Sequence, residues 1–334
     1  MDLETYNSVL RIVNSIPLLA CPHFSYISKQ IGVPKNTLHS IYSQEVQWRL
    51  RQSIGDLKAR VPELVQQYTS APQSSSTITS PSQPSNLKSL TDTCFELNLP
   101  PCFVLRQILP TLFRLPKKAI TDIFKEPNSL LEIVTTGAAL SALQEQGHPD
   151  PTPADANAFL HRLLTDIQAC VLADINCGPA SDAARHAAGL EFEEKLNQAL
   201  HEAGIAHWTE RNLRDAGHHK TPDARLRVPI AVQGKIICWI DSKATFGDER
   251  QHTIYKKEQY DKYLNRYGSG MVVYWHGYLA SLQSAAENVL LVDQFPEVDR
   301  STAPATIAAA PAVVMLEQLD LDKYLSLPIA TNEI

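Results

Sequence analysis

Three side chains that could perform hydrolytic chemistry lie in one stretch of the sequence, Lys220–Glu249. Asp223 follows a Thr-Pro pair, and Asp241 and Lys243 end the mostly apolar run KIICWIDSK. Residues 241 and 243 are two positions apart, so in a β-strand their side chains project from the same face. Two carboxylates and an ammonium group at one end of an apolar strand indicate either a cation-binding site or a structural ion pair.

A hairpin would return Asp223 to Asp241. The Gln-Gly pair at 233–234 is typical of a tight turn between two strands. A strict two-residue turn pairs Asp223 with Ala244, however, which places Asp223 on the face opposite Asp241. A shared site therefore requires one extra residue, as a three-residue loop or a bulge, or a frayed end at Asp223. Pro229 lacks a backbone donor and is a plausible position for such an irregularity.

Two neighbouring carboxylates repel each other unless a cation neutralises them. Lys243 alone could do so, and the group would then be only structural. A divalent metal is the alternative, and Mg²⁺ or Mn²⁺ suits oxygen ligands with open water positions. Such a metal polarises a phosphoryl oxygen and lowers the pKa of a bound water. In that case Asp223, Asp241 and the Ser242 carbonyl would bind the metal, and Lys243 would position the attacking water.

An additional carboxylate lies in the predicted helix Ser181–Ala203. Its apolar stripe is formed by Phe192, Leu196, Ala199, Leu200 and Ala203. At 100° per residue, Glu193 lies about 70° from the centre of this stripe and Glu191 about 130° away. We therefore favour Glu193 for the site and keep Glu191 as the alternative, which could instead pair with Lys195 on the surface.

Downstream of Asp-Ser-Lys, the predicted helix Tyr255–Tyr267 carries Gln259 and Tyr263. Their i,i+4 spacing places them on one helix face. They could support Lys243 or contact a substrate strand, and an ordinary polar face with a packed tyrosine is the alternative.

The order Pro-Asp, hairpin, Asp-x-Lys resembles the signature of the PD-(D/E)xK nuclease superfamily. The phrase GLEFE at 189–193 resembles the superfamily's G-x-x-F-E helix motif, whose Glu completes the metal site. Gln259 and Tyr263 resemble the Q-x-x-x-Y motif of its RecB-like members. The resemblance implies an α/β domain with a restriction-endonuclease-like mixed sheet flanked by helices.

A narrower resemblance covers residues 174–296. HKTPD (219–223), IDSKATFGDE (240–249) and GMVVYWHGY (270–278) are similar to phrases of the codanin-interacting nuclease family. Asp-Ser-Lys replaces the family's Glu-Ser-Lys, and Gly-Leu-Glu-Phe-Glu lacks two histidines of the corresponding family phrase. The resemblance implies a metal-dependent nuclease-fold protein that binds a codanin-like partner through its C-terminal domain. It also implies a location mainly in the nucleus, with the cytoplasm as a second expected location.

The composition along the chain predicts five segments. Two helix-turn-helix-like modules, 1–68 and 87–150, flank a Ser/Thr/Pro-rich segment at 69–86. This segment is predicted to be a flexible linker, because it cannot bury enough apolar surface to become ordered. Strands and helices alternate over 154–296, the predicted nuclease-like domain. The tail, 297–334, is expected to be a linker with a possible docking helix in MLEQLDLDKYL.

The bulk properties narrow the function classes. The 334 residues carry a formal net charge of -6, so any nucleic-acid contact must come from local patches. No apolar run is long enough for a membrane span, and the first residues do not resemble a secretory signal. The six cysteines form no CxxC pairs, so we expect them to be reduced thiols.

We therefore predict a Mg²⁺- or Mn²⁺-dependent nuclease. One alternative is a catalytically weak or inactive nuclease-fold scaffold that binds protein partners. The other is a DNA-binding regulator that uses the helix-turn-helix pattern in Phe24–Trp48, although the second helix of this pattern has no dense basic face.

Overall fold

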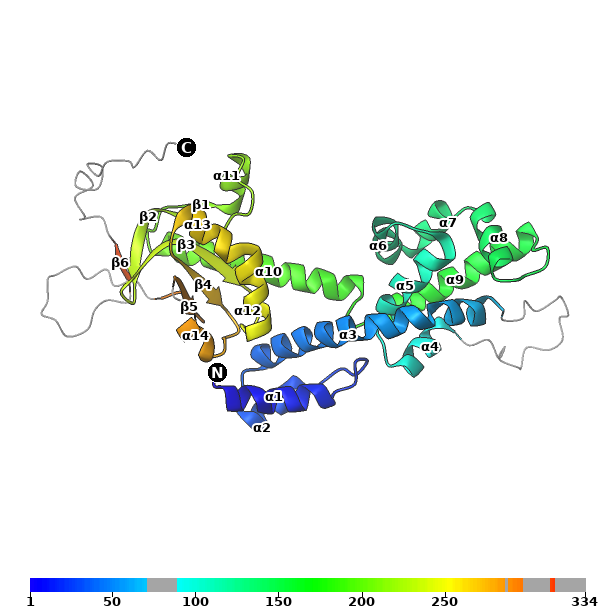
Figure 1. The fold of residues 1–334 in the computed structure, drawn as a ribbon, viewed down its shortest axis with the longest axis horizontal. Helices are drawn as coiled ribbons and strands as arrows, with labels where there is room; N and C mark the ends of the chain where they lie inside the picture. Colours follow the sequence, from blue (N-terminus) through cyan, green and yellow to red (C-terminus); the bar gives the residue numbers. More distant parts are fainter. Residues whose placement is uncertain (71–88, 286–287, 297–312, 316–334) are drawn as a thin grey trace, which may run out of the picture. The chain divides into compact units, whose positions relative to one another are not determined.

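The computed structural model describes residues 1–70, 89–285, 288–296 and 313–315. The chain forms two compact units (Figure 1). The helical unit comprises Leu10–His186, and the α/β unit comprises Met1–Val9 together with residues from Ala187 onward. Among the helices of the described ranges, none is long and apolar enough to cross a membrane.

The helical unit consists of helices joined by short turns. Its members are α1 (Leu3–Ser15, in part), α2 (Phe24–Ile31), α3 (Lys35–Thr69), α4 (Leu90–Leu97), α5 (Pro101–Phe113), α6 (Lys117–Lys125), η1 (Pro127–Ser129), α7 (Leu130–Ile133), α8 (Thr136–Glu145), α9 (Pro153–Ala173) and the start of α10 (Pro179–Glu202). Buried Asp174 accepts backbone hydrogen bonds from Cys102, Asn176 and Cys177 at 2.7, 2.9 and 2.6 Å, and so fixes the loop that leads into α10.

Both predicted helix–turn–helix segments have the expected local structure. Gly32 ends α2 in the left-handed region at φ 69°, and α3 begins at Lys35. Asn98 ends α4 at φ 49°, and α5 begins at Pro101. However, α3 continues for 35 residues, and Arg49 on it donates a 2.8 Å hydrogen bond to the Ile16 carbonyl. Arg49 is therefore engaged within the unit.

The compact units differ in extent from the predicted modules. Helix α9 buries Leu160, Leu163 and Ile167 within the helical unit, so the predicted boundary near 150–154 falls inside this unit. The physical reason is that a Pro-rich turn ends a helix without ending a core. At the other end of the chain, Tyr6 stacks on Phe246 with ring centroids 5.6 Å apart, which assigns the first residues to the α/β unit.

The predicted linker and tail fall mostly outside the described residues. Thr69, the first predicted linker residue, is instead the last residue of α3. Within the tail, Val313–Met315 forms strand β6 and pairs antiparallel with β2, so these three residues are not linker. The predicted docking helix after Met315 lies outside the described part of the chain.

The α/β unit contains a mixed sheet, as predicted. Its strands are β1 (His207–Thr209), β2 (Ala224–Val232), β3 (Lys235–Lys243), β4 (Gly270–Tyr274) and β5 (Val289–Val292), in the order β1-β2-β3-β4-β5. β1, β2 and β3 pair antiparallel, whereas β3, β4 and β5 pair parallel. The helices of this unit are the rest of α10, α11 (Glu210–Asp215), α12 (Glu249–Tyr255), η2 (Lys256–Tyr260), α13 (Asp261–Tyr267) and α14 (Ser281–Ala285).

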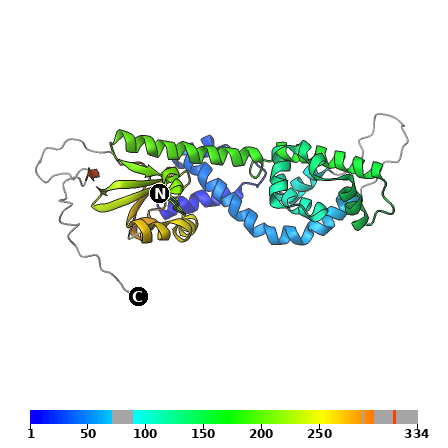
Figure 2. The same ribbon diagram turned by 90° about the horizontal axis from the view of Figure 1, so that it is seen from above.

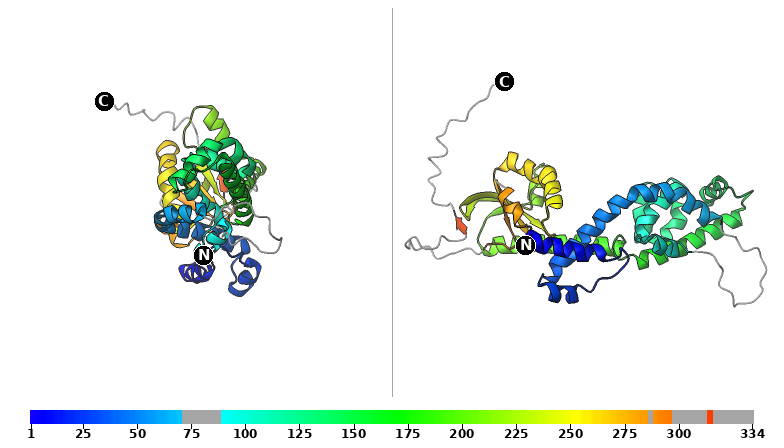
Figure 3. Two further views of the ribbon diagram at one scale, coloured as in Figure 1. Left: turned by 90° about the vertical axis from the view of Figure 1, so that its right-hand side faces the viewer. Right: turned by 60° about the horizontal axis from the view of Figure 1, so that its bottom comes forward.

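Helices cover both faces of this sheet (Figure 2). Leu196 and Leu200 of α10 are fully buried against one face, in a cluster with Ile230, Ile237, Ile240, Met271, Val273 and Leu290. Helix α13 packs on the other face, where Trp239 meets Tyr263 edge-on at 5.1 Å. Figure 3 gives a second view of α12 and α13 beside the strands. Apolar residues on both faces explain why the β3 segment has an almost continuous apolar sequence.

Gly270 makes the closest approach in this packing. It pairs with Trp239 across β3 and β4, and a Cβ added at Gly270 would lie 2.1 Å from the indole ring. We expect Gly270→Ala to destabilise the protein by about 3 kcal/mol, because the buried ring cannot move away. Gly189→Ala on α10, where a Cβ meets nothing within 4 Å, should instead gain up to about 1 kcal/mol from helix propensity. Urea unfolding of both variants measures the difference, and equal stabilities would contradict the packing argument.

Candidate active site

The β2–β3 hairpin has the irregularity that a shared site requires. Near the turn, Ile230 pairs with Ile237 and Val232 with Lys235; beyond it, Arg225 pairs with Trp239 and Ala224 with Ile240. Four residues of β2, Leu226–Pro229, therefore lie opposite Cys238 alone. The excess is three residues rather than one, and it includes Pro229. Because three is odd, the next rung places Asp223 opposite Asp241 on the same face. The predicted bulge is confirmed.

The turn itself contains two residues, as the Gln-Gly pair indicates. Gln233 and Gly234 have φ values of 50° and 74°, the positive values that a type I′ turn requires at both central positions. The change of face therefore comes entirely from the bulge.

Asp241 and Lys243 form a buried ion pair. Their side chains are 2 % and 12 % exposed, and the Lys243 ammonium contacts Asp241 Oδ2. Burial disfavours the lysine charge, but Asp241 and Asp223 outweigh it and hold the pKa of Lys243 above its ordinary value. The ammonium group therefore stays charged in the site.

Asp223, which directly precedes β2, faces this pair. Its Oδ2 accepts a 2.7 Å hydrogen bond from the Ser242 backbone N–H. Burial first, and then the charge of Asp241, raise the pKa of Asp223 well above its ordinary value, although Lys243 opposes the shift. The two carboxylates thus share more negative charge than one ammonium group neutralises.

Glu193 of α10 is partly buried. Its charge adds to the rise in the pKa of Asp223, whereas Glu191 is exposed on the same helix. The structure therefore brings Glu193, and not Glu191, toward Asp223, in agreement with the helical-wheel angles.

Ser242 and its neighbours fix α10 against the end of the sheet. The Trp275 indole N–H donates a 2.8 Å hydrogen bond to Ser242 Oγ. Phe192 stacks on Trp275 at 5.5 Å, and the Lys195 ammonium lies 4.3 Å from the indole centroid. This aromatic contact sets the position of Glu193, which is the next residue after Phe192.

Tyr263 positions the segment that leads to Asp223. Its hydroxyl donates a 2.8 Å hydrogen bond to the Thr221 carbonyl and is buried. On the same helix, Arg266 donates to the His219 carbonyl at 2.7 Å. Tyr263 therefore orients the Thr-Pro-Asp backbone through these contacts.

Gln259 lies in a π-helical turn, η2, between α12 and α13. This turn replaces the continuous α-helix predicted over 255–267, and π-turns often occur at functional sites. The Gln259 Oε1 atom is buried without a hydrogen-bond partner. No hydrogen bond between Gln259 and Lys243 is found among the described residues.

Two tyrosines missed by the sequence reasoning surround the lysine. The Lys243 ammonium lies 4.7 Å from the Tyr255 ring centroid and 6.0 Å from that of Tyr260. Each ring face attracts a cation and excludes water. The sequence signal for them was the pair Tyr255 and Tyr260, five residues apart on the helix after Asp-Ser-Lys. Both rings point toward β3 because this helix contains a π-helical turn.

Asp248 and His252, which follow the motif, have structural roles. Asp248 caps α12 by accepting a 2.6 Å hydrogen bond from the Gln251 N–H. Buried His252 shares a 3.1 Å hydrogen bond with the Tyr274 hydroxyl, and burial lowers the pKa of His252.

The donor set suits a hard cation in part. Asp223 and Asp241 face each other, and their oxygens that neither Lys243 nor the Ser242 N–H contacts could act as ligands. Over residues 1–70, 89–285, 288–296 and 313–315, no three His, Cys, Asp or Glu side chains are grouped closely enough to hold a metal. The remaining positions would be filled by water, backbone carbonyls or phosphate oxygens, as is common for Mg²⁺.

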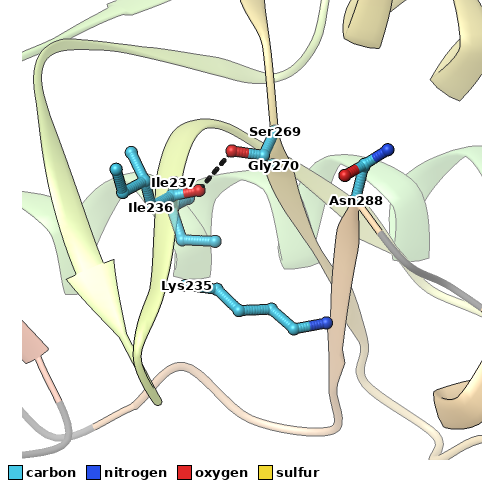
Figure 4. A pocket seen from close by; sticks show the side chains of 6 residues that line it. All are labelled: Lys235, Ile236, Ile237, Ser269, Gly270 and Asn288. Carbon is cyan, nitrogen blue, oxygen red and sulfur yellow. Dashed lines mark hydrogen bonds between the residues drawn. The ribbon is translucent and has the colours of Figure 1, made fainter.

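A hollow of about 270 Å³ lies at the opposite end of β3 (Figure 4). Lys235, Ile236 and Asn288 are among its lining residues, and Ser269 Oγ donates to the Ile236 carbonyl at 2.6 Å. Six residues of strand, about 20 Å, separate Lys235 from Asp241. This hollow is therefore distinct from the carboxylate–lysine group.

The raised pKa of Asp223 has a consequence for stability. Between its ordinary value of 3.8 and its folded value, the folded state holds a proton that the unfolded chain has released. Stability therefore falls as the pH rises through this window. We expect Asp223→Asn, which keeps the acceptor for Ser242, to stabilise the metal-free protein at pH 7.5 by about 1 kcal/mol, or a few degrees in Tm. Thermal melts in EDTA from pH 4 to 8 measure this effect.

The matched control is Asp215→Asn, which makes the same change on a side chain that is 73 % exposed. Its Tm should follow that of the unmodified protein at every pH. Two results together would contradict a destabilising charge at Asp223. The Tm of Asp223→Asn at pH 7.5 would be below that of the unmodified protein, and its pH dependence would equal that of the unmodified protein.

The fold and the site define an α/β protein whose mixed sheet ends in a carboxylate pair and a buried lysine. Similarity to known proteins identifies its family. The family model described as a protein of unknown function with the TPD sequence motif matches residues 160–295. The chain is 31 % identical over 304 residues to CDAN1-interacting nuclease 1 of Danio rerio, covering 87 % of this chain and 88 % of the relative.

Other relatives carry the same name. Identity is 33 % over 264 residues with the Xenopus tropicalis protein, covering 79 % of this chain and 78 % of the relative. Identity is 39 % over 163 residues with the Homo sapiens protein, and the match covers 46 % of this chain and 58 % of the relative. No solved structure matches the chain. The chain belongs to the CDAN1-interacting nuclease 1 family.

Proposed function

We propose that this protein is a Mg²⁺- or Mn²⁺-dependent nuclease that hydrolyses phosphodiester bonds of nucleic acid. The observation that carries this proposal is the odd-numbered bulge, which places Asp223 opposite Asp241 and beside Lys243. A bulge of three residues weakens the ladder, so a purely structural hairpin gains nothing from it. The names of the relatives, all nucleases, support the same activity.

Each side chain has a distinct role in this proposal. Asp223, Asp241 and the Ser242 carbonyl bind the metal, with Glu193 as a further ligand. The metal supplies Lewis-acid polarisation of the phosphate and a water of lowered pKa. Lys243, which stays charged, holds the attacking water and stabilises the negative charge that develops on the phosphoryl oxygens. Tyr263 keeps Asp223 in place through Thr221.

The direct test is cleavage of labelled single-stranded and duplex DNA and RNA by the purified full chain. We expect cleavage with Mg²⁺ or Mn²⁺ and none with EDTA. Absence of cleavage of all four substrates with either metal would overturn the proposed activity.

Glu193 and Glu191 provide a matched pair of variants. Glu193→Gln is expected to reduce the cleavage rate by about a hundredfold, because it removes a charge next to the metal ligands. Glu191→Gln makes the same change on an exposed side chain and should stay within about twofold. A hundredfold loss in Glu191→Gln instead would assign the site to that residue. Rates come from single-turnover time courses with Mn²⁺.

A nuclease-fold scaffold is the second candidate. Lys243 pairs with Asp241, so the protein itself neutralises part of the charge of the site. In this case the unmodified protein and variants at Asp241 would show the same low background rate.

The relatives' names lead us to propose that this chain also binds a codanin-like protein, through its α/β unit. Co-purification of the tagged full chain with such a protein tests binding. Retention by the Glu193→Gln variant would show that binding and cleavage use separate features.

A further inference from the structure

Two arginines extend the β2 face on which Asp223 lies. Between 223 and 227, β2 pairs regularly with β1: Arg225 lies opposite Trp208, and the Arg227 N–H donates a 2.9 Å hydrogen bond to the Ala206 carbonyl. Alternate residues of a strand share a face. Asp223, Arg225 and Arg227 therefore form one row with steps of about 7 Å.

Aromatic rings hold both guanidinium groups in place. The Arg225 guanidinium carbon lies 4.9 Å from the Trp208 ring centroid and 5.1 Å from that of Tyr267. Arg227 lies 5.3 Å from the same indole ring. Tyr267 ends α13, which runs beside these strands (Figure 1). We call Trp208, Arg225, Arg227 and Tyr267 the arginine–aromatic row.

Neither arginine of the row is neutralised by an acid. Within the described residues, no carboxylate forms a salt bridge with Arg225 or Arg227. On nearby α11, by contrast, Arg214 pairs with Glu210 at 2.6 Å and Arg211 with Asp215 at 4.0 Å. In a chain of net charge -6, two adjacent unneutralised guanidinium groups beside a carboxylate site are a local exception.

A guanidinium stacked on a ring keeps its N–H donors in the plane of the group, where they can bind phosphate oxygens in pairs. The stacking also limits its rotamers, so less entropy is lost on binding. Single-strand binding surfaces combine such cations with aromatic rings on which bases stack. β2 offers one row of cations, which matches the single backbone of one strand.

We propose that the arginine–aromatic row binds the phosphates of a single nucleic-acid strand and leads it toward Asp223 and Asp241. This inference rests on the proposed nuclease function for the class of ligand. Arg225 and Arg227 contact successive phosphates, and the partly exposed side chains of Trp208 and Tyr267 contact bases or sugars.

The test is fluorescence anisotropy with the full chain and 5′-labelled 20-nucleotide single-stranded DNA and RNA, with the matching duplexes as competitors. EDTA is present throughout, so that binding is measured without cleavage. We expect Arg225→Gln/Arg227→Gln to weaken single-strand binding by about tenfold or more, and to reduce the salt slope by about 1.4, the value for two phosphate contacts.

The control is Arg211→Gln/Arg214→Gln, which removes the same charge from arginines that already pair with acids. Its affinity and its salt slope should both stay within about twofold of the values for the unmodified protein. Arg227→Gln alone changes an exposed side chain, so it is expected to fold, and it should lower the slope by about 0.7. Circular dichroism checks that each variant is folded.

Three results would overturn the inference: unchanged binding in Arg227→Gln and in the double variant, equal losses in the double variant and its control, or binding of duplex in preference to single strands. The outcome is independent of the hydrolysis. A chain that binds single strands through this row but cleaves nothing would retain the inference and lose the proposed activity. A chain that cleaves while the row variants bind normally would do the reverse.

Discussion

Replacing Asp241 with Asn is expected to reduce phosphodiester cleavage by at least about a thousandfold, because it removes a buried carboxylate charge at the centre of the site. Asn has nearly the same shape, so the fold should be retained. Without Asp241, the pKa of Asp223 should fall, because the repulsion between the two carboxylates is part of its rise. The measurement is single-turnover cleavage with saturating Mn²⁺, together with a pH titration of thermal stability in EDTA.

Asp248→Asn is the matched control for this variant. Asp248 is also a buried carboxylate of the α/β unit, 6 % exposed, but it caps α12 and does not face Asp223. Asn caps helices about as well as Asp, so the cleavage rate should stay within about threefold. Equal losses in the two variants would mean that Asp241 acts through general stability rather than through the site.

Lys243→Met is expected to have the second-largest effect. It leaves Asp223 and Asp241 facing each other without their ammonium partner, which should cost about 3 kcal/mol in the metal-free protein at neutral pH. The loss should be smaller at pH 4 to 5, because protonation of Asp223 removes the repulsion. Cleavage should fall by about a hundredfold or more, since the group that positions the water and stabilises the phosphoryl charge is absent.

Addition of Mg²⁺ separates the two roles of Lys243. A bound cation would replace the missing charge, so Mg²⁺ should raise the Tm of Lys243→Met more than that of the unmodified protein. Lys195→Met is the control, because Lys195 is an exposed lysine that lies over Trp275. A Tm for Lys243→Met that does not respond to Mg²⁺ or Mn²⁺ would argue against a metal between Asp223 and Asp241.

Local sequence rules located much of the α/β unit. The apolar runs on either side of the Gln-Gly pair became β2 and β3, because positive φ at both turn residues leaves few alternatives to a tight hairpin. The helical-wheel angles separated Glu193 from Glu191, because a helix face is set by a fixed rotation per residue. The two-residue alternation of a strand also predicted an irregular hairpin, because a regular one places Asp223 and Asp241 on opposite faces.

Other features depend on contacts between distant segments, which local rules do not describe. The π-turn at Lys256–Tyr260 changes the spacing of Gln259 and Tyr263. Tyr6 joins the α/β unit through a ring contact with a residue 240 positions away, and α9 joins the helical unit although a Pro-rich turn precedes it. In each case the outcome is set by which apolar surfaces meet.

The amino-acid sequence by itself determined which chemistry is available: two carboxylates, a lysine and a helix-borne glutamate, with types and spacings typical of a metal-dependent nuclease. Only the tertiary structure decided that Asp223, Asp241 and Lys243 meet. The bulge at Leu226–Pro229 inserts three residues where the sequence required an odd number, and this brings Asp223 to the face of Asp241. The sequence does not specify the number of extra residues in the bulge, because any odd number places Asp223 on the face of Asp241. The actual number depends on how β1, β3 and α13 pack around β2.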